Sequence, residues 1–144
     1  MTHVLVPIDG SPPSWDALDY AIETFAGERI TVLNVVDPLE GMYADEDGSY
    51  YDPEMAERAR ERGAELGEEA RERLDAAGAL STTEFESAVE TGRVARTINE
   101  YVEEHDVDHV VIGSHGREGV SRILLGSVSE KVARRATVPV TIIR

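Results

Sequence analysis

The chain has 144 residues, 41% of them hydrophobic and 30% charged, with no cysteine and a formal net charge of −15 at pH 7. The length and composition predict one folded domain over residues 1–144, and the lack of cysteine excludes disulfides, thiol catalysis and thiolate metal sites. The acidity argues against nucleic acid as a partner, because phosphate backbones attract clustered lysine and arginine.

No membrane or secretion signal is visible in the sequence. There is no run of about 18 apolar residues, and no basic segment followed by an apolar stretch at the N-terminus. We therefore expect a cytoplasmic protein with no membrane partner.

The charge is unevenly distributed along the chain. Residues 113–144 contain six basic and two acidic residues, a net charge of +4, which leaves −19 for residues 1–112. An anionic ligand should therefore prefer the C-terminal segment. Lys131 is the only lysine, and an acid-rich, lysine-poor surface is typical of proteins from a high-salt cytoplasm. The alternative is an ordinary acidic protein.

In chain order, the first expected element is a buried strand at residues 3–8, with Pro7 near its end. A helix follows from Ser11, with prolines in its first turn, as far as Gly27. Residues 29–36 are a β-branched run and predict a second strand. Residues 37–52 are polar, acidic and punctuated by glycine and tyrosine, so we expect a long loop there.

A long surface helix is expected over residues 53–77, although Gly63 and Gly67 should weaken it. Its inner side is predicted to carry five residues: Met55, Ala59, Leu66, Ala70 and Leu74. The alternating residues 81–89 predict a third strand near a sheet edge.

The next helix should open at Thr91-Gly92, because Val94, Ile98 and Val102 follow at helical spacing. Strands are then predicted at residues 108–112 and 138–143. Between these strands lie a glycine-punctuated loop and a final helix. That helix is expected to open with Ser127-Val128-Ser129-Glu130, which matches a capping box.

This alternation of strands and helices predicts a doubly wound, five-stranded parallel sheet with helices on both faces. Such sheets hold ligands beyond the carboxyl ends of the strands, where the strand order reverses. If the order is 3-2-1-4-5, the loops after the first strand (Asp9-Gly10-Ser11) and after the fourth (from Gly113) face one crevice.

The second of these loops suits a phosphate group. Glycines at 113, 116 and 126 let backbone N–H groups approach an anion, and the following helix N-terminus adds unpaired donors. Arg117 adds a positive charge, and the Ser127 hydroxyl either contacts phosphate or caps the helix. On glycine content alone, an ordinary turn remains the alternative.

The spacing Gly113-x2-Gly116-x9-Gly126-Ser127 resembles the nucleotide signature of the universal stress protein family. The resemblance extends over nearly the whole chain. Its most specific stretches are Val111–Gly116 and Leu124–Glu130, and the opening Val4–Ser11 and the segments Leu33–Asp37 and Val138–Val140 also fit. The resemblance implies the order 3-2-1-4-5, the adenine nucleotide α-hydrolase-like fold and a bound ATP, with or without Mg²⁺.

The resemblance also implies the roles of individual residues. Asp9 would contact the ribose and the main chain of Val35 the adenine. The phosphate contacts would be Gly113, Gly116, Arg117, Gly126, Ser127 and Val128. Asp9 has the alternative of capping the first helix turn. The side chain of Val35 is expected in the core, so that only its backbone reads a base.

We expect a nucleotide-dependent regulatory or stress-response module with little or no turnover, because no Walker lysine and no base for water attack are evident. The alternatives are a slow ATPase or self-phosphorylating protein, and a chaperone-like interaction module. The four histidines lack metal-binding spacing, so no metal site is expected. A homodimer is expected through the edge strand 138–143, with Pro139 as the counterargument.

Overall fold

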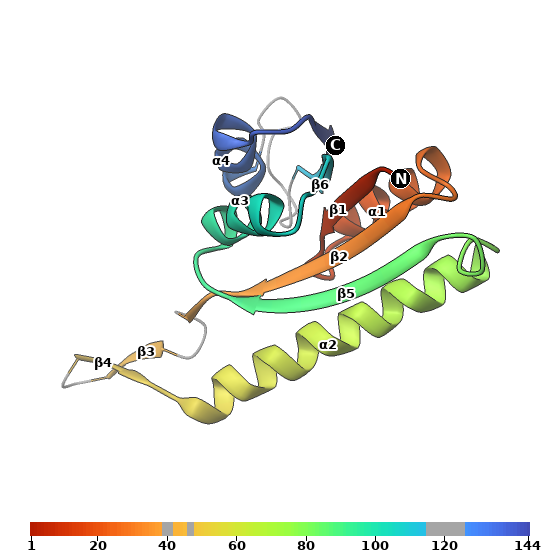
Figure 1. Ribbon diagram of the computed structural model, residues 1–144. Helices are drawn as coiled ribbons and strands as arrows, with labels where there is room; N and C mark the ends of the chain where they lie inside the picture. Colours follow the sequence, from red (N-terminus) through yellow and green to blue (C-terminus); the bar gives the residue numbers. More distant parts are fainter. Residues whose placement is uncertain (39–41, 46–47, 115–125) are drawn as a thin grey trace.

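The computed structural model describes residues 1–38, 42–45, 48–114 and 126–144, and at 42–45 and 48–51 it describes the backbone alone. Five parallel strands form the main sheet in the order β5-β2-β1-β6-β7 (Figure 1). Their bounds are β1 His3–Pro7, β2 Arg29–Val36, β5 Glu84–Thr91, β6 His109–Gly113 and β7 Val140–Ile143. Counted along the chain, these five strands have the predicted order 3-2-1-4-5, which is confirmed.

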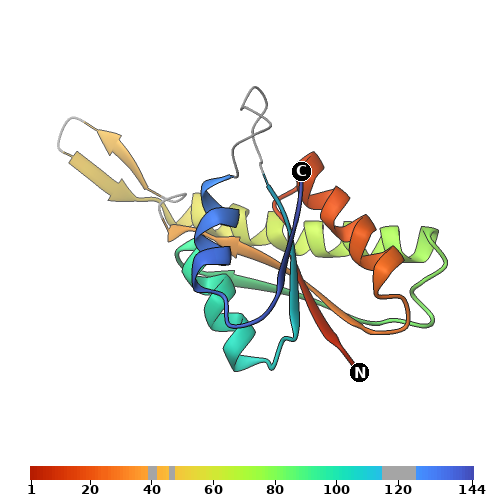
Figure 2. The same ribbon diagram turned by 90° about the horizontal axis from the view of Figure 1, so that it is seen from above.

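Helices cover both faces of this sheet. Their bounds are α1 Pro12–Thr24, α2 Pro53–Ala76, α3 Val94–Glu104 and α4 Ser127–Arg135. Side chains of α1 and α2 pack in one buried cluster with Val4 and Val6, whereas those of α3 and α4 pack in a second cluster with Leu5. Figures 1 and 2 show the two helix pairs on opposite sides. Successive residues of β1 thus point to opposite faces and are buried on both, which explains its uninterrupted apolar sequence.

The long helix α2 uses its glycines to approach the sheet closely. A Cβ at Gly63 would lie 2.6 Å from Asn34 Oδ1, and one at Gly67 would lie 2.8 Å from the Cβ of Ser87. These glycines lower helix propensity, but only they allow this contact with β2 and β5. The predicted inner position of Met55 is wrong: its side chain is 41% exposed, and Ala56 is buried instead.

The expectation of a loop over residues 37–52 is also corrected. Met42–Asp45 (β3) and Gly48–Tyr51 (β4) pair as an antiparallel hairpin, with Tyr43 opposite Tyr50. The hairpin extends away from the main sheet ahead of α2 (Figures 1 and 2). Four-residue strands are too short to establish an alternating pattern, which is why the sequence did not reveal them.

In the part of the chain that the structure describes, no helix is long and apolar enough to cross a membrane.

Candidate functional site

The strand order reverses at β1. The chain passes from β1 to its neighbour β2 on one side, and β6 pairs with β1 on the other. At the carboxyl edge, the segments that follow β1 and β6 are in contact. A Cβ at Gly113, the last residue of β6, would lie 2.5 Å from the carbonyl carbon of Pro13 in α1. The two loops chosen from the sequence therefore flank one edge, where such sheets hold their ligands.

Gly113 consequently has a structural reason to be glycine. Any side chain there would collide with the backbone of the first turn of α1, which is not free to move like the end of a flexible side chain. The absence of a Cβ at this position serves the packing of α1 against β6, whether or not a ligand also approaches it.

Asp9 lies in the turn between β1 and α1. Its Oδ1 accepts a hydrogen bond from Ser11 N–H at 2.9 Å, and the residue is exposed. The buried Ser14 hydroxyl donates to Ser11 O at 2.9 Å and closes the same turn. Asp9 therefore closes the turn that precedes α1 and does not cap the helix, whose N-cap is Ser11, and the residue is exposed at the carboxyl edge.

Val35 presents its main chain toward the same edge. The last backbone bond between β1 and β2 is Ile8 N–H to Leu33 O, whereas Val36 O accepts from Gly92 N–H on the β5 side. Because peptide groups alternate in direction along a strand, the N–H and C=O of Val35 face the β1 side, beyond the end of β1. The Val35 side chain packs partly buried in the α3/α4 cluster, as expected.

The start of α4 differs from the predicted capping box. Gly126 is the N-cap, with extended φ and ψ of −64° and 152°, and no side chain among the described residues caps the helix. Ser127 is already helical, and Glu130 pairs instead with Arg134 at 2.7 Å. The capping box is therefore wrong, because the helix begins one residue earlier than that pattern requires. As a result, the N–H groups of the first turn have no side-chain cap from the described residues, and such groups suit an external acceptor.

Three residues at this edge were missed in the sequence. The Ser129 hydroxyl contacts the carbonyls of Ser114 and Gly126 at 3.3 and 3.0 Å, and the Asn34 amide donates to Ile8 O at 2.8 Å. Arg62 of α2 places Nη2 3.0 Å from where a Gly10 Cβ would lie. No sequence motif marks these contacts, since each joins elements that only the fold brings together.

Two of the predicted phosphate contacts, Gly116 and Arg117, lie outside the described residues, as does His115. The described edge thus brings together the other six: Asp9 after β1, Val35 near the end of β2, Gly113 at the end of β6, and Gly126, Ser127 and Val128 at the start of α4.

The titratable groups with shifted pKa values lie at the opposite, amino edge of the sheet or on α3. Burial lowers the pKa of His3, with Arg29 adding to the effect, and burial also lowers the pKa of His109. Burial raises the pKa of Tyr101, with Glu86 and Glu90 adding to the effect. Among the described residues, no three acidic or histidine side chains gather as a metal site.

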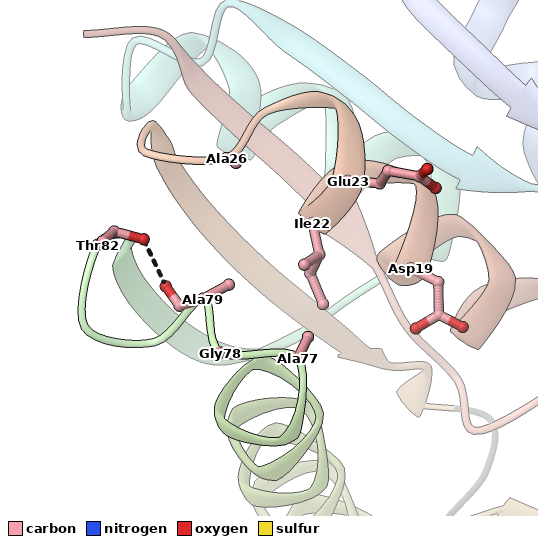
Figure 3. Close-up of a pocket in the computed structure, with 8 residues that line it drawn as sticks. All are labelled: Asp19, Ile22, Glu23, Ala26, Ala77, Gly78, Ala79 and Thr82. Atoms are coloured by element: carbon pink, nitrogen blue, oxygen red, sulfur yellow. Dashed lines mark hydrogen bonds between the residues drawn. The ribbon is translucent and has the colours of Figure 1, made fainter.

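An open hollow of about 500 Å³ lies between the end of α1 and the α2–β5 turn (Figure 3). Its floor includes Ile22 and Ala79, and Asp19 and Glu23 carry carboxylates on the α1 side. This hollow shares no residue with the carboxyl edge described above, and its carboxylates do not suit an anionic ligand.

Comparison with known proteins gives a consistent result. The model of the universal stress protein family matches residues 1–144. A universal stress protein of Methanocaldococcus jannaschii is 32% identical over 145 residues, an alignment that covers 98% of this chain and 81% of that protein.

Solved structures agree with the sequence comparison. The structure of the universal stress protein UspA from Lactobacillus plantarum matches with a TM-score of 0.79 and 26% identity, covering 99% of this chain and 97% of that one. A universal stress protein solved in complex with cAMP matches with a TM-score of 0.72 and 26% identity, covering 99% and 96%.

Proposed function

The chain belongs to the universal stress protein family, and we propose that it binds ATP at the carboxyl edge of β1 and β6 as a nucleotide-dependent regulatory protein. One observation carries the proposal: at the switch point of the sheet, no described side chain caps the start of α4. Its first-turn N–H groups and the positive end of its dipole therefore suit a phosphate. The cAMP complex of a similar protein supports an adenine nucleotide as the ligand.

Each described residue has a chemically defined part in this proposal. The exposed carboxylate of Asp9 would accept from ribose hydroxyls, and the N–H and C=O of Val35 would pair with the adenine edge. Gly126, Ser127 and Val128 would donate main-chain N–H bonds to the phosphates, with Gly113 beside them. Gly116 and Arg117 complete the signature in the sequence. The net charge of +4 over residues 113–144 favours an anion in this otherwise acidic chain.

We further propose that turnover is slow or absent. Transfer of a phosphoryl group needs a residue that orients the nucleophile and cations that stabilise the transferring charge. At the carboxyl edge, Asp9 and Asp37 follow β1 and β2, and Asp9 Oδ1 already accepts a bond from Ser11 N–H. A kcat of about 1 per second or more would favour the alternative of an ATPase.

The same proposal includes a homodimer formed through β7. This strand ends the sheet order: it pairs with β6 on one side, and no other described strand pairs with its outer side. Two such edges can pair about a two-fold axis.

Ligand identity is tested on protein purified without added nucleotide. After denaturation, mass spectrometry of the released small molecules should find ATP, and calorimetry of the emptied protein should rank ATP above GTP. A released ligand without an adenine ring, or equal affinity for ATP and GTP, would contradict the adenine assignment. Binding of adenosine as tightly as ATP would contradict the phosphate assignment.

A further inference from the structure

The buried hydroxyl of Ser129 joins the two ends of the β6–α4 connection. Ser129 lies one turn into α4 and is 1% exposed. Its Oγ is 3.3 Å from the carbonyl oxygen of Ser114, where the chain leaves β6, and 3.0 Å from that of Gly126, where the chain enters α4. The hydroxyl has one proton, which these two carbonyls share.

Ser114 is held from its other side as well. Its N–H donates to Ile143 O of β7 at 2.8 Å, and the residue is 5% exposed. The peptide groups on both sides of Ser114 are thereby fixed to two different elements, β7 and α4. Within the described residues, the Ser129 hydroxyl thus joins the first turn of α4 to the end of β6, in addition to the apolar packing of Val128 and Val132.

We infer that Ser129 is a positioning residue for phosphate recognition, an inference that rests on the proposed ATP site. The hydroxyl contacts no ligand in this role. It holds the N-terminus of α4, whose free N–H groups face the phosphates, at a fixed place relative to the end of β6. Recognition of a charged phosphate by backbone dipoles is steep in distance, so a loosened α4 should lose phosphate affinity before it loses adenine or ribose affinity.

The structure indicates that removing this hydroxyl leaves the fold intact. In Ser129→Ala, Gly126 O keeps its helical bond from Glu130 N–H at 3.0 Å. The substitution therefore removes the hydrogen bond to Ser114 O, which joins the end of β6 to α4. Threonine at this position keeps the hydroxyl donor for Ser114 O and Gly126 O.

The test compares ATP with adenosine by calorimetry in wild-type protein, Ser129→Ala and Ser129→Thr. Ser129→Ala should weaken ATP binding by about fivefold or more, the effect of one lost hydrogen bond, and leave adenosine affinity unchanged. Ser129→Thr should restore ATP affinity. Thr83→Val is the matched control, because it removes a buried hydroxyl that has no partner, at the far edge of the sheet.

The outcomes separate this inference from the proposed function. Equal losses for ATP and adenosine, or no loss in a folded Ser129→Ala protein, would overturn the positioning role while the ATP site stands. A wild-type protein that binds no ATP would overturn both. If Ser129→Ala does not fold, Ser129→Cys replaces it in the same comparison, since a thiol of similar size is a weak donor.

Discussion

The side-chain amide of Asn34 donates to the carbonyl of Ile8 at 2.8 Å, just beyond the last backbone bond between β1 and β2. If the ladder continued, Ile8 O would accept from Val35 N–H. The Asn34 amide donates to that carbonyl instead, so the backbone pairing of β1 with β2 ends at this point. The main chain of Val35 is thereby left facing the carboxyl edge, where the adenine is proposed to bind.

Asn34→Asp should therefore destabilise the fold. The carboxylate has nearly the same shape but cannot donate to Ile8 O, and two acceptors then face each other at a cost of about 1–3 kcal/mol. The measurement is the free energy of unfolding in guanidinium chloride at pH 7. Asn99→Asp is the control, because the Asn99 amide is 3.5 Å from Val132 O and makes a longer bond. Equal effects of the two substitutions would contradict the importance of the Asn34 bond.

Stability should fall as the pH drops below about 6.5, the ordinary pKa of histidine. His3 is buried, with Nδ1 3.1 Å from His105 O and Nε2 2.8 Å from Thr31 Oγ1, and burial lowers its pKa in the fold. The pKa of His109 is lowered for the same reason. The unfolded chain therefore binds protons at a higher pH than the folded chain does. The stability that comes from keeping these histidines neutral is lost as the pH falls below about 6.5.

Chemical denaturation at pH 7.5, 6.5 and 5.5 measures this loss. Replacing both histidines by glutamine should lower stability at pH 7.5 but flatten its pH dependence over this range. A wild-type protein that is equally stable at pH 5.5 and 7.5 would contradict the effect assigned to burial. Asp108 and Glu86, which raise the pKa of His3, reduce the expected size of the loss without changing its sign.

Thermal stability should rise with salt. The formal charge of −15 repels itself most at low ionic strength, where the Debye length is about 30 Å at 0.01 M, against about 3 Å at 1 M. The melting temperature should therefore increase from dilute buffer to molar KCl. Sorbitol at the same osmolality is the control, because it screens no charge. A rise in melting temperature that occurs in KCl but not in sorbitol is therefore electrostatic. A melting temperature that is flat in KCl would mean that the acidity is no adaptation to salt.

The dimer prediction gains support from the direction of the peptide groups in β7. Pro139 O accepts from Val110 N–H, and Ile143 O accepts from Ser114 N–H, so residues 139, 141 and 143 face β6. Alternate residues face the other way, which places the N–H groups of Val140 and Ile142 on the open edge. Pro139 therefore removes a donor on the inner side, and the objection that it protects the outer edge no longer holds.

Ile142→Pro removes an outward-facing donor from that edge and should convert the dimer into a folded monomer. Ile142→Lys is a poorer test, because the Ile142 side chain packs against the α3/α4 cluster and a charge there would disturb the subunit itself. Ile142→Val, which keeps the donor, should stay dimeric. Sedimentation at micromolar concentration in high salt measures the oligomeric state of each variant. A monomeric wild-type protein would contradict pairing through β7.

The sequence predicts the main sheet well, because the central strands β1 and β6 are buried and read as apolar runs, whereas the edge strand β5 alternates. It fails where local pattern and tertiary contact disagree. Gly63 and Gly67 indicate a weak helix by propensity, whereas in the fold they bring α2 against β2 and β5. Met55 has helical spacing with the inner residues but lies at the exposed start of α2.

For the site, the sequence identifies the loops and the glycines but not the contacts that hold them. Ser127-x-x-Glu130 satisfies a capping pattern, yet the helix begins at Ser127 and Glu130 pairs with Arg134. Ser129 and Asn34 bond to carbonyls on other elements, and no spacing in the chain encodes such partners.

Binding of ATP at the start of α4 is tested most directly by a matched pair of valine substitutions. Gly126 and Ala136 flank α4 with nearly the same backbone conformation, φ −64° with ψ 152° and φ −64° with ψ 139°, and valine is compatible with both. By calorimetry, Gly126→Val should lower ATP affinity at least tenfold, or about 1.4 kcal/mol, because its side chain obstructs the free N–H groups, whereas Ala136→Val should bind ATP like the wild type. Gly116→Val in the same motif should behave like Gly126→Val. Unchanged ATP affinity in a folded Gly126→Val protein would contradict the site.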